Sequence, residues 1–195
     1  MVLGGDDSIP IPVLRAYRDV GPLCVVQIDA HIDFRDEVNG VTEGLSSTMR
    51  RASEMPWVSG IAQVGLRGIG SAREREFADA RAFGAVHITA AEIHRDGIAP
   101  ALARIPDADR YFITLDIDGL DPAIAPGVIA PAFGGLSYFQ AFDLIRGVAA
   151  RGRIVGFDVV EVVPELDVRN LTSLLAARLV MVMIGSIAWS GQLTG

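Results

Sequence analysis

The sequence predicts an α/β fold in which helices cover both faces of a central parallel sheet. Short runs rich in β-branched residues alternate with helix-like stretches, which is the pattern of a parallel α/β sheet. Several of these runs are apolar almost throughout, as expected for strands that are buried on both faces. The chain of 195 residues has a one-domain length, and no linker or internal repeat divides it. We therefore expect a single domain over residues 1–195.

Five strands are expected where apolar runs are bounded by turn-forming residues. The first reads LCVVQID and the fourth reads YFITLD, so that each ends on an aspartate. In chain order the predicted strands are Leu23–Asp29, Ile61–Leu66, Ala85–Ile88, Tyr111–Asp116 and Ile154–Val160.

Five helices are expected between and after these strands. Ser71 followed by Glu74 predicts a capping box for the second helix. Ser137 is a suitable N-cap for the fourth helix, and Gly152 would end it. In chain order the predicted helices are Pro10–Tyr17, Ser71–Phe83, Ala99–Ile105, Ser137–Ala150 and Leu171–Trp189.

Composition and charge exclude several classes of protein. A net charge of −7 with no compensating basic stripe argues against nucleic-acid binding. The longest apolar stretch, Leu171–Trp189, contains Arg178 and three hydroxyl residues, so we expect a buried or interface helix and no membrane span. The start of the chain does not resemble a secretory signal, and the single cysteine, Cys24, has no internal disulfide partner. These features favour a cytoplasmic protein.

Two acid-rich segments follow predicted strands directly. Asp29, His31 and Asp33 follow the first strand, whereas Asp116 and Asp118 end or follow the fourth. Ligands of open parallel sheets bind beyond the carboxyl ends of the strands, which is where both segments would lie. Carboxylates together with one imidazole suit a divalent ion of the Mn²⁺ type. The matching positions of the two segments therefore predict one shared site for two metal ions.

Each segment also has a simpler interpretation. Acidic clusters often lie on solvated loops, and an Asp-x-Asp sequence can belong to a turn. For Asp121 the turn is the preferred interpretation because a proline follows it, so we assign it a supporting role.

Four segments of the chain resemble, in order, the signature motifs of the ureohydrolase superfamily, which contains arginase and agmatinase. They are GGDDSI, DAHID, LDIDGLDP and EVVPELD. The segments APGVIAPAFGG and MRRASE are more similar to the agmatinase branch. The resemblance runs from residue 3 to the C-terminal helix. It implies a three-layer α/β/α sandwich, two Mn²⁺ ions (or Ni²⁺ or Co²⁺), a small guanidino substrate that is hydrolysed to urea and an amine, and a homo-oligomer, usually a trimer or hexamer.

The resemblance also implies roles for individual residues. Asp29 and Asp116 match the carboxylates that bridge the two metals. Glu161, after the apolar run GFDVV, matches the acid that pairs with the substrate guanidinium, and a carboxylate can hold that planar cation in a bidentate pair. The positions that match metal ligands are Asp29, His31, Asp33, Asp116 and Asp118. The residues predicted to be catalytic are Glu161, Asp33 and Glu43.

The first departure from the family pattern is at Asp7. The family segment usually reads GGDHS, in which the histidine binds one metal, whereas this chain has GGDDS. Aspartate can also bind Mn²⁺, so Asp7 is a candidate sixth ligand. The additional negative charge should weaken the metals as Lewis acids. We expect either a weak first metal or a shifted metal preference.

The second departure is in the loop after DAHID, which contains no histidine where relatives carry a proton shuttle. One alignment places Glu43 at that position and another places Leu45 there. Glu43 could donate a proton if partial burial raised its pKa; otherwise it is a solvated loop acid.

The third departure is at the N-terminus, which is shorter than in family members. Val2 and Leu3 look like the remainder of the strand that normally leads into GGDDS. We therefore expect the first strands of the family sheet to be missing, which would expose a sheet edge unless a partner covers it.

Two functions remain open from the sequence. The first is a metal-dependent hydrolase of a small guanidino compound, of agmatinase type. The second is a metal-binding relative or fragment with impaired or no turnover, which Asp7, the missing loop histidine and the short N-terminus favour. A nucleotide-binding module is a distant third, because GGDDS is too weak a glycine motif for a phosphate loop.

Overall fold

The computed structural model describes residues 1–193, and within them six strands form one sheet in the order β1-β6-β5-β2-β3-β4. Every neighbouring pair of strands is parallel. The strands are β1 Val2–Leu3, β2 Leu23–Ile28, β3 Val58–Leu66, β4 Val86–Thr89, β5 Arg110–Asp116 and β6 Arg153–Val160. The predicted α/β class with a parallel sheet is therefore confirmed.

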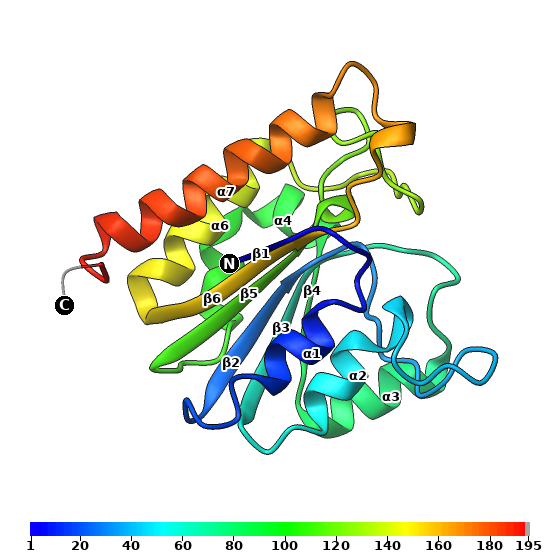
Figure 1. Cartoon of the computed structure of the whole chain (residues 1–195), viewed down its shortest axis with the longest axis vertical. Coiled ribbons are helices and arrows are strands. Elements are labelled where there is room, and N and C mark those ends of the chain that lie inside the picture. Colours follow the sequence, from blue (N-terminus) through cyan, green and yellow to red (C-terminus); the bar gives the residue numbers. More distant parts are fainter. Residues whose placement is uncertain (194–195) are drawn as a thin grey trace.

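Helices cover both faces of this sheet and make three layers (Figure 1). One face packs against the first three helices, and the other face packs against the remaining four. The first set is α1 Pro10–Arg15, α2 Thr48–Ser53 and α3 Glu74–Phe83. The second set is α4 Ala90–Asp96, α5 Ile98–Arg104, α6 Tyr138–Arg151 and α7 Leu171–Trp189.

The core consists of two apolar clusters, one on each face of the sheet. Alternate residues of each strand enter different clusters: in β2, Val25 packs toward α1 and α2, whereas Val26 and Ile28 pack toward α6 and α7. All six residues of β2 are buried. Burial on both faces explains why this strand reads as a nearly continuous apolar run.

The order of the strands reverses beside β2. From β2 the chain proceeds through β3 to β4 at one edge, and then returns to place β5 on the other side of β2. Such a switch point leaves a crevice beyond the carboxyl ends of the two central strands. At this switch point Asp29 follows β2 and Asp116 ends β5.

The start of α3 differs from the sequence prediction, and two short helices were not predicted. The predicted capping box of Ser71 and Glu74 is wrong: α3 begins at Glu74, and Glu76 Oε2 accepts the backbone N–H of Arg73 at 2.5 Å. The short helices α2 and α4, of six and seven residues, were not predicted. By contrast, α7 has its predicted bounds.

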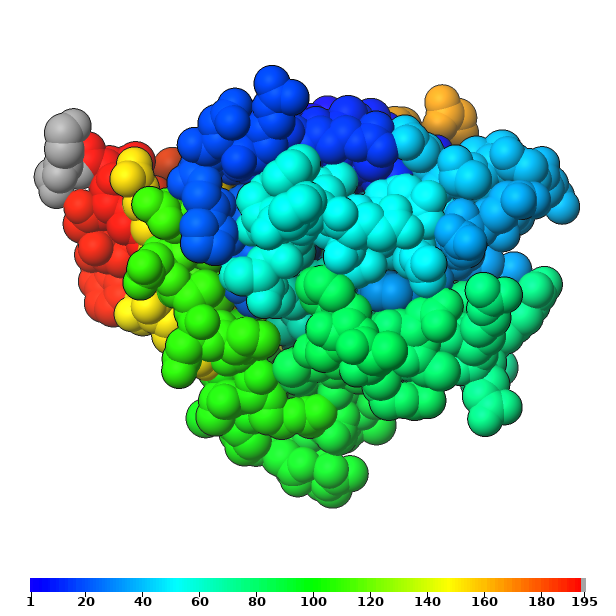
Figure 2. All heavy atoms as spheres, turned by 90° about the horizontal axis from the view of Figure 1, so that it is seen from below, coloured from blue at the N-terminus to red at the C-terminus, as the bar shows by residue number. Residues whose placement is uncertain are grey.

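Helix α7 is long and apolar enough to cross a membrane by length and composition alone, which is weak support for a span because core helices pass the same test. One side of it packs on α6 and β6, where Leu179 and Met183 are fully buried. Its opposite side exposes Leu174 and Met181. The loop around residue 40 and the C-terminal end of α7 lie at opposite ends of the molecule (Figures 1 and 2).

The predicted cap of α6 is confirmed. Ser137 Oγ accepts the N–H of Gln140 at 3.3 Å, and Gln140 Oε1 accepts the N–H of Ser137 at 2.8 Å. The helix ends at Arg151, and Gly152 is its C-cap.

We expect Ser137→Ala to lower the free energy of unfolding by about 1 kcal/mol, because the first turn of α6 loses its side-chain acceptor. Ser137→Asp keeps an acceptor and should stay near the parent. Urea unfolding followed by circular dichroism measures both. Equal stability of Ser137→Ala and Ser137→Asp would show that the cap contributes nothing.

Candidate metal centre

The two acid-rich segments meet at the switch point of the sheet. Asp29 follows β2 and Asp116 ends β5, and these two strands are hydrogen-bonded neighbours. The N–H of Ala30 donates to Asp118 Oδ1 at 3.1 Å, which links the two segments directly. The sequence prediction of one shared site is therefore consistent with the geometry.

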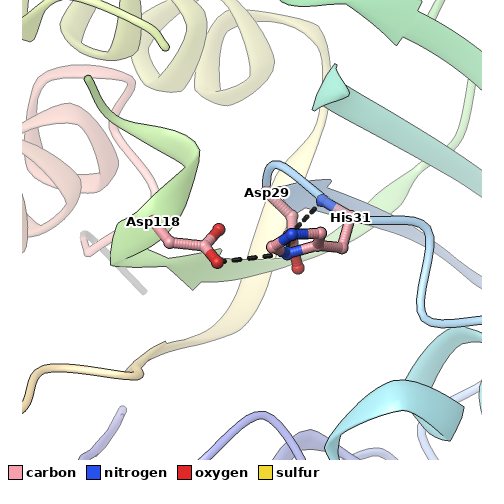
Figure 3. Close-up of side chains that lie close together, drawn as sticks. All are labelled: Asp29, His31 and Asp118. Atoms are coloured by element: carbon pink, nitrogen blue, oxygen red, sulfur yellow. Dashed lines mark hydrogen bonds and ion pairs between the residues drawn. The ribbon is translucent and has the colours of Figure 1, made fainter. Parts of the chain in front are cut away.

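Six of the predicted site residues gather here, and five of them form two groups with ligand atoms within 4.8 Å of one another. Asp29 belongs to both groups, as a bridging carboxylate would. One group is Asp29, His31 and Asp118, and the other is Asp7, Asp29 and Asp33. Figure 3 shows the first group, in which the side chains from the two segments point toward one another.

Backbone donors fix carboxylates of both acid-rich segments. The N–H of His31 donates to Asp29 Oδ1 at 2.6 Å, and the N–H of Asp118 donates to Asp116 Oδ1 at 2.7 Å. His31 Nδ1 lies 3.1 Å from Asp118 Oδ2. Asp116 belongs to neither of the two groups. It is almost fully buried, and its carboxylate lies directly beside Asp118.

Two glycines allow the segments to approach closely. A Cβ on Gly68 would lie 2.1 Å from His31 Cδ2, and a Cβ on Gly119 would lie 2.9 Å from the backbone nitrogen of Asp29. Neither position can carry a side chain without moving a ligand residue.

Arg67 holds the segment after β5, and the sequence analysis missed it. Its guanidinium donates to the carbonyl oxygens of Asp118 at 2.7 Å, Leu120 at 3.0 Å and Ala132 at 2.8 Å, with two further carbonyls in reach. Within the described part of the chain, it makes no ion pair with a carboxylate. It therefore fixes the backbone that carries Asp118, and its charge also attracts the carboxylates of Asp118, Asp29 and Asp116 through space. The sequence signal that could have indicated Arg67 is its position directly after the apolar strand β3.

Asp121 has the turn role predicted for it. Its Oδ1 accepts the N–H of Ala123, and its Oδ2 accepts the N–H groups of Gly134 and Gly135. It closes the loop behind the metal ligands.

Asp7 lies inside the site, where the sequence placed it as a candidate ligand. It follows β1 and is 2% exposed, and its N–H donates to Glu161 Oε1 at 2.9 Å. Neither of its carboxylate oxygens has a hydrogen-bond partner among residues 1–193. A buried carboxylate without a partner is costly, and a cation would remove that cost. The donor set and these two oxygens thus fit a divalent ion.

Electrostatic repulsion and burial raise the pKa values of the cluster. Burial is the largest cause for Asp7, Asp29 and Asp116, and the charges of neighbouring carboxylates raise their pKa values further. Burial also raises the pKa of Asp33, to about 6. Burial acts to lower the pKa of His31, but the hydrogen bond to Asp118 and nearby negative charges outweigh it, so that this pKa is raised.

Glu161 and Asp33 have unusual backbone conformations. Both are in the left-handed region, with φ of 66° and 42°. Residues other than glycine adopt this conformation at a cost, and they concentrate at functional sites. Glu161 is 7% exposed, and burial raises its pKa above the ordinary value. The turn at Glu161 brings it to the backbone of Asp7.

The condition under which Glu43 could donate a proton, a pKa raised by partial burial, is not met. Glu43 is exposed, and Arg15 Nη1 donates to its Oε2 at 3.0 Å. This hydrogen bond lowers the pKa of Glu43, which makes the carboxyl a weaker proton donor. The solvated loop acid is the correct interpretation.

Comparison with known proteins identifies the family of the chain and its fold. The model of the arginase family matches residues 1–185. The chain belongs to the arginase family. The resemblance seen in the sequence motifs is thereby confirmed.

Individual members of the arginase family are similar over nearly all of this chain. It is 36% identical over 190 residues to a guanidinobutyrase of Pseudomonas aeruginosa and 35% identical over 191 residues to a mitochondrial agmatinase of Gallus gallus. These alignments cover 94% of this chain but 59% and 55% of the two relatives. The arginase-family chain thus spans less than two thirds of their length.

A solved structure shows the same fold. The proclavaminate amidino hydrolase from Streptomyces clavuligerus superposes with a TM-score of 0.85 at 30% identity. The superposition covers 96% of this chain and 63% of that one. The three-layer arginase-like sandwich is therefore confirmed.

The raised pKa values predict an unusual pH dependence of stability. Without metal, the folded chain binds protons at these carboxylates more tightly than the unfolded chain, in which aspartate has a pKa of about 3.9. The free energy of unfolding in a chelator should therefore fall as the pH rises from about 4 through the pKa of about 6 at Asp33. With Mn²⁺ present this fall should be reversed, because the ions bind the deprotonated carboxylates.

Urea unfolding across this pH range, with chelator and with Mn²⁺, measures the effect. The same pH dependence in both series would contradict it, because the metal would then not be bound by these groups.

Because aspartate stands in place of histidine at position 7, we expect the first metal ion to bind weakly. We expect Asp7→His to bind its first Mn²⁺ more tightly, because the change removes one negative charge from the crowded ligand set. Asp6→His, at the exposed neighbouring position, is the matched control. Calorimetric titration of metal into parent and variants gives stoichiometry and affinity. Unchanged values in Asp7→His would overturn the expectation.

Proposed function

We propose that the chain is a hydrolase of a small guanidino compound, of agmatinase type, that uses two divalent metal ions and releases urea and an amine. The observation that carries the proposal is the convergence of the six metal-ligand candidates with Glu161 at one crevice of an arginase-family fold. Two of the compared relatives, a guanidinobutyrase and an agmatinase, are named for guanidino substrates. Mn²⁺ is the proposed metal, with Ni²⁺ or Co²⁺ as alternatives, because the donors are mainly carboxylates with one imidazole.

In this proposal each of the two groups of candidate ligands binds one metal ion. One ion would be held by Asp29, His31 and Asp118, and the other by Asp7, Asp29 and Asp33. Asp29 is common to both groups, and Asp116 beside Asp118 is the second bridging candidate. When bound, two such ions supply Lewis acidity, which makes water nucleophilic at neutral pH and stabilises developing negative charge.

Glu161 is the proposed binding residue for the guanidinium. Its Oε1 accepts the N–H of Asp7, and no other donor within residues 1–193 contacts its second oxygen. The hydrogen bond orients the carboxylate at the edge of the metal site. A carboxylate held in this way can accept two parallel N–H bonds from the planar cation. That would place the guanidinium carbon beside the ions.

Of the three residues predicted to be catalytic, two remain in the proposal. Glu161 and Asp33 lie at the site, whereas Glu43 is paired with Arg15 on the surface. The departing amine still needs a proton, and the loop over residues 30–47 contains no histidine other than His31 to supply it. This feature favours the second candidate function, a relative that binds metal with little or no turnover.

The proposal extends to the location and the partners of the protein. A net charge of −7 supports a chain that binds neither nucleic acid nor membranes, and the buried free thiol of Cys24 supports a cytoplasmic location. The exposed apolar side of α7 supports a homo-oligomer, a trimer or a hexamer by the family resemblance.

We expect urea release from one or more guanidino compounds in the presence of Mn²⁺, and its loss in Glu161→Gln. The carboxylate's charged hydrogen bonds contribute about 3 kcal/mol, which corresponds to about 100-fold in kcat/KM. Glu165→Gln, an exposed acid in the same loop, is the control and should retain parent activity. A panel of agmatine-like amines and guanidino acids, assayed with Mn²⁺, Ni²⁺ and Co²⁺, covers the substrate class.

The outcomes separate the two candidate functions. Clear metal binding without turnover of any compound would support the second function and contradict the first. Absence of metal binding would contradict both.

A further inference from the structure

A row of polar residues crosses the sheet one rung below the metal ligands. The strands pair Asp158 with Thr114, Thr114 with Gln27, Gln27 with Gln63, and Gln63 with His87. Neighbouring residues of β2, β3 and β5 on this face are apolar and pack against α1 and α2. Gln27, Gln63 and Thr114 are all 0% exposed. Buried amides in an apolar layer are costly unless their bonds are used.

The two glutamines of this row form a chain of hydrogen bonds that leads to the metal ligands. Gln63 Nε2 donates to the carbonyl of Ile32 at 2.7 Å and to Gln27 Oε1 at 2.6 Å. Gln27 Nε2 in turn donates to Asp29 Oδ2 at 2.6 Å and to Asp33 Oδ2 at 2.9 Å. Every hydrogen of both amide groups is thus used.

The carbonyl of Ile32 fixes the orientation of both amide groups. A backbone carbonyl can only accept, so the nitrogen of the Gln63 amide must face Ile32. The same nitrogen faces Gln27, which must therefore present its oxygen to Gln63 and its NH₂ group to the carboxylates. A reversed Gln27 would place its oxygen against two carboxylates. The relay, defined as Gln63 and Gln27, therefore has one orientation.

Asp29 and Asp33, which both accept a hydrogen bond from Gln27, would bind the same metal ion. Asp29 and Asp33 come together only in the group that also contains Asp7. Asp33 is held in the left-handed conformation by the loop, so its side chain has no regular element to fix it. Gln27 ties it to Asp29, whose other oxygen accepts the N–H of His31.

We propose that Gln27, oriented by Gln63, is a positioning residue that holds Asp29 and Asp33 together for the ion at the Asp7 side of the centre. The proposal rests on the metal-binding part of the proposed function. A neutral amide can join two carboxylates without adding a positive charge that would compete with the cation. Because the relay is excluded from water, its bonds are not weakened by solvent exchange.

Metal binding tests the relay independently of catalysis. In Gln27→Leu, Mn²⁺ at the Asp7 side should bind about 10- to 100-fold more weakly, the usual loss when a partner of a metal ligand is removed. The affinity of the other ion should change much less. Free Mn²⁺ measured by electron paramagnetic resonance during titration gives both binding steps. His31→Ala, which removes a ligand of the other group alone, assigns the steps.

Two further variants separate positioning from general disruption. Gln63→Leu removes the orienting donor but leaves Gln27 in place, so it should weaken the same step by less than Gln27→Leu. The double variant should bind no more weakly than Gln27→Leu, because Gln63 acts only through Gln27. Thr114→Val changes a buried residue of the same row that has no hydrogen bond to a ligand, and should bind both ions like the parent. Gln63→Leu also serves if Gln27→Leu fails to fold.

The results distinguish this proposal from the proposed function. A parent chain that binds two ions and a folded Gln27→Leu that binds them equally well would overturn the relay alone. Equal weakening of both ions in Gln27→Leu, or the same loss in Thr114→Val, would also overturn it. A parent chain that binds no metal would overturn both proposals.

Discussion

Mutual repulsion of carboxylates that are buried at one end of the sheet is the constraint on which the rest of the structure depends. Asp7, Asp29 and Asp116 are almost fully buried, and burial together with the charges of neighbouring carboxylates raises the pKa of each. A group of this kind would normally be solvated or dispersed. The fold stabilises these carboxylates with neutral donors. Backbone N–H groups and the Gln27 amide donate hydrogen bonds to them, where many other proteins use cationic side chains. The negative charge is thus left for metal ions.

The surrounding scaffold follows the same rule. The hydrogen bonds of the Arg67 guanidinium go to backbone carbonyls of the segment that carries Asp118. Gly68 and Gly119 provide close approach where any side chain would displace His31 or Asp29. The switch point between β2 and β5 supplies the crevice, and the short turn at Glu161 closes it. Backbone geometry therefore positions the site, and side-chain charge is reserved for its chemistry.

The strands and the acid-rich segments that follow them were predictable because their signal is local. Buried strands read as apolar runs, and Asp29 and Asp116 stand at the ends of two such runs. Contacts between distant segments were not predictable. The bond from Asp7 to Glu161 joins residues 154 apart, and the surface pair of Glu43 with Arg15 joins residues 28 apart, so neither the burial of Asp7 nor the exposure of Glu43 could be derived from a pattern. Gln27 likewise resembled one polar residue in an apolar strand until its neighbour on β3 was known.

The separation along the chain of the residues that build the centre also bears on how the molecule is assembled. β2, β3 and β4 are consecutive and can pair early, since only moderate loops must close. The two-residue β1 joins the far edge of β6 and brings in Asp7, which requires both extremes of the sequence to meet. Contacts of such long range form slowly. We therefore expect docking of β1 to follow the pairing of the central strands, so that capture of the ion at Asp7 would come late in folding.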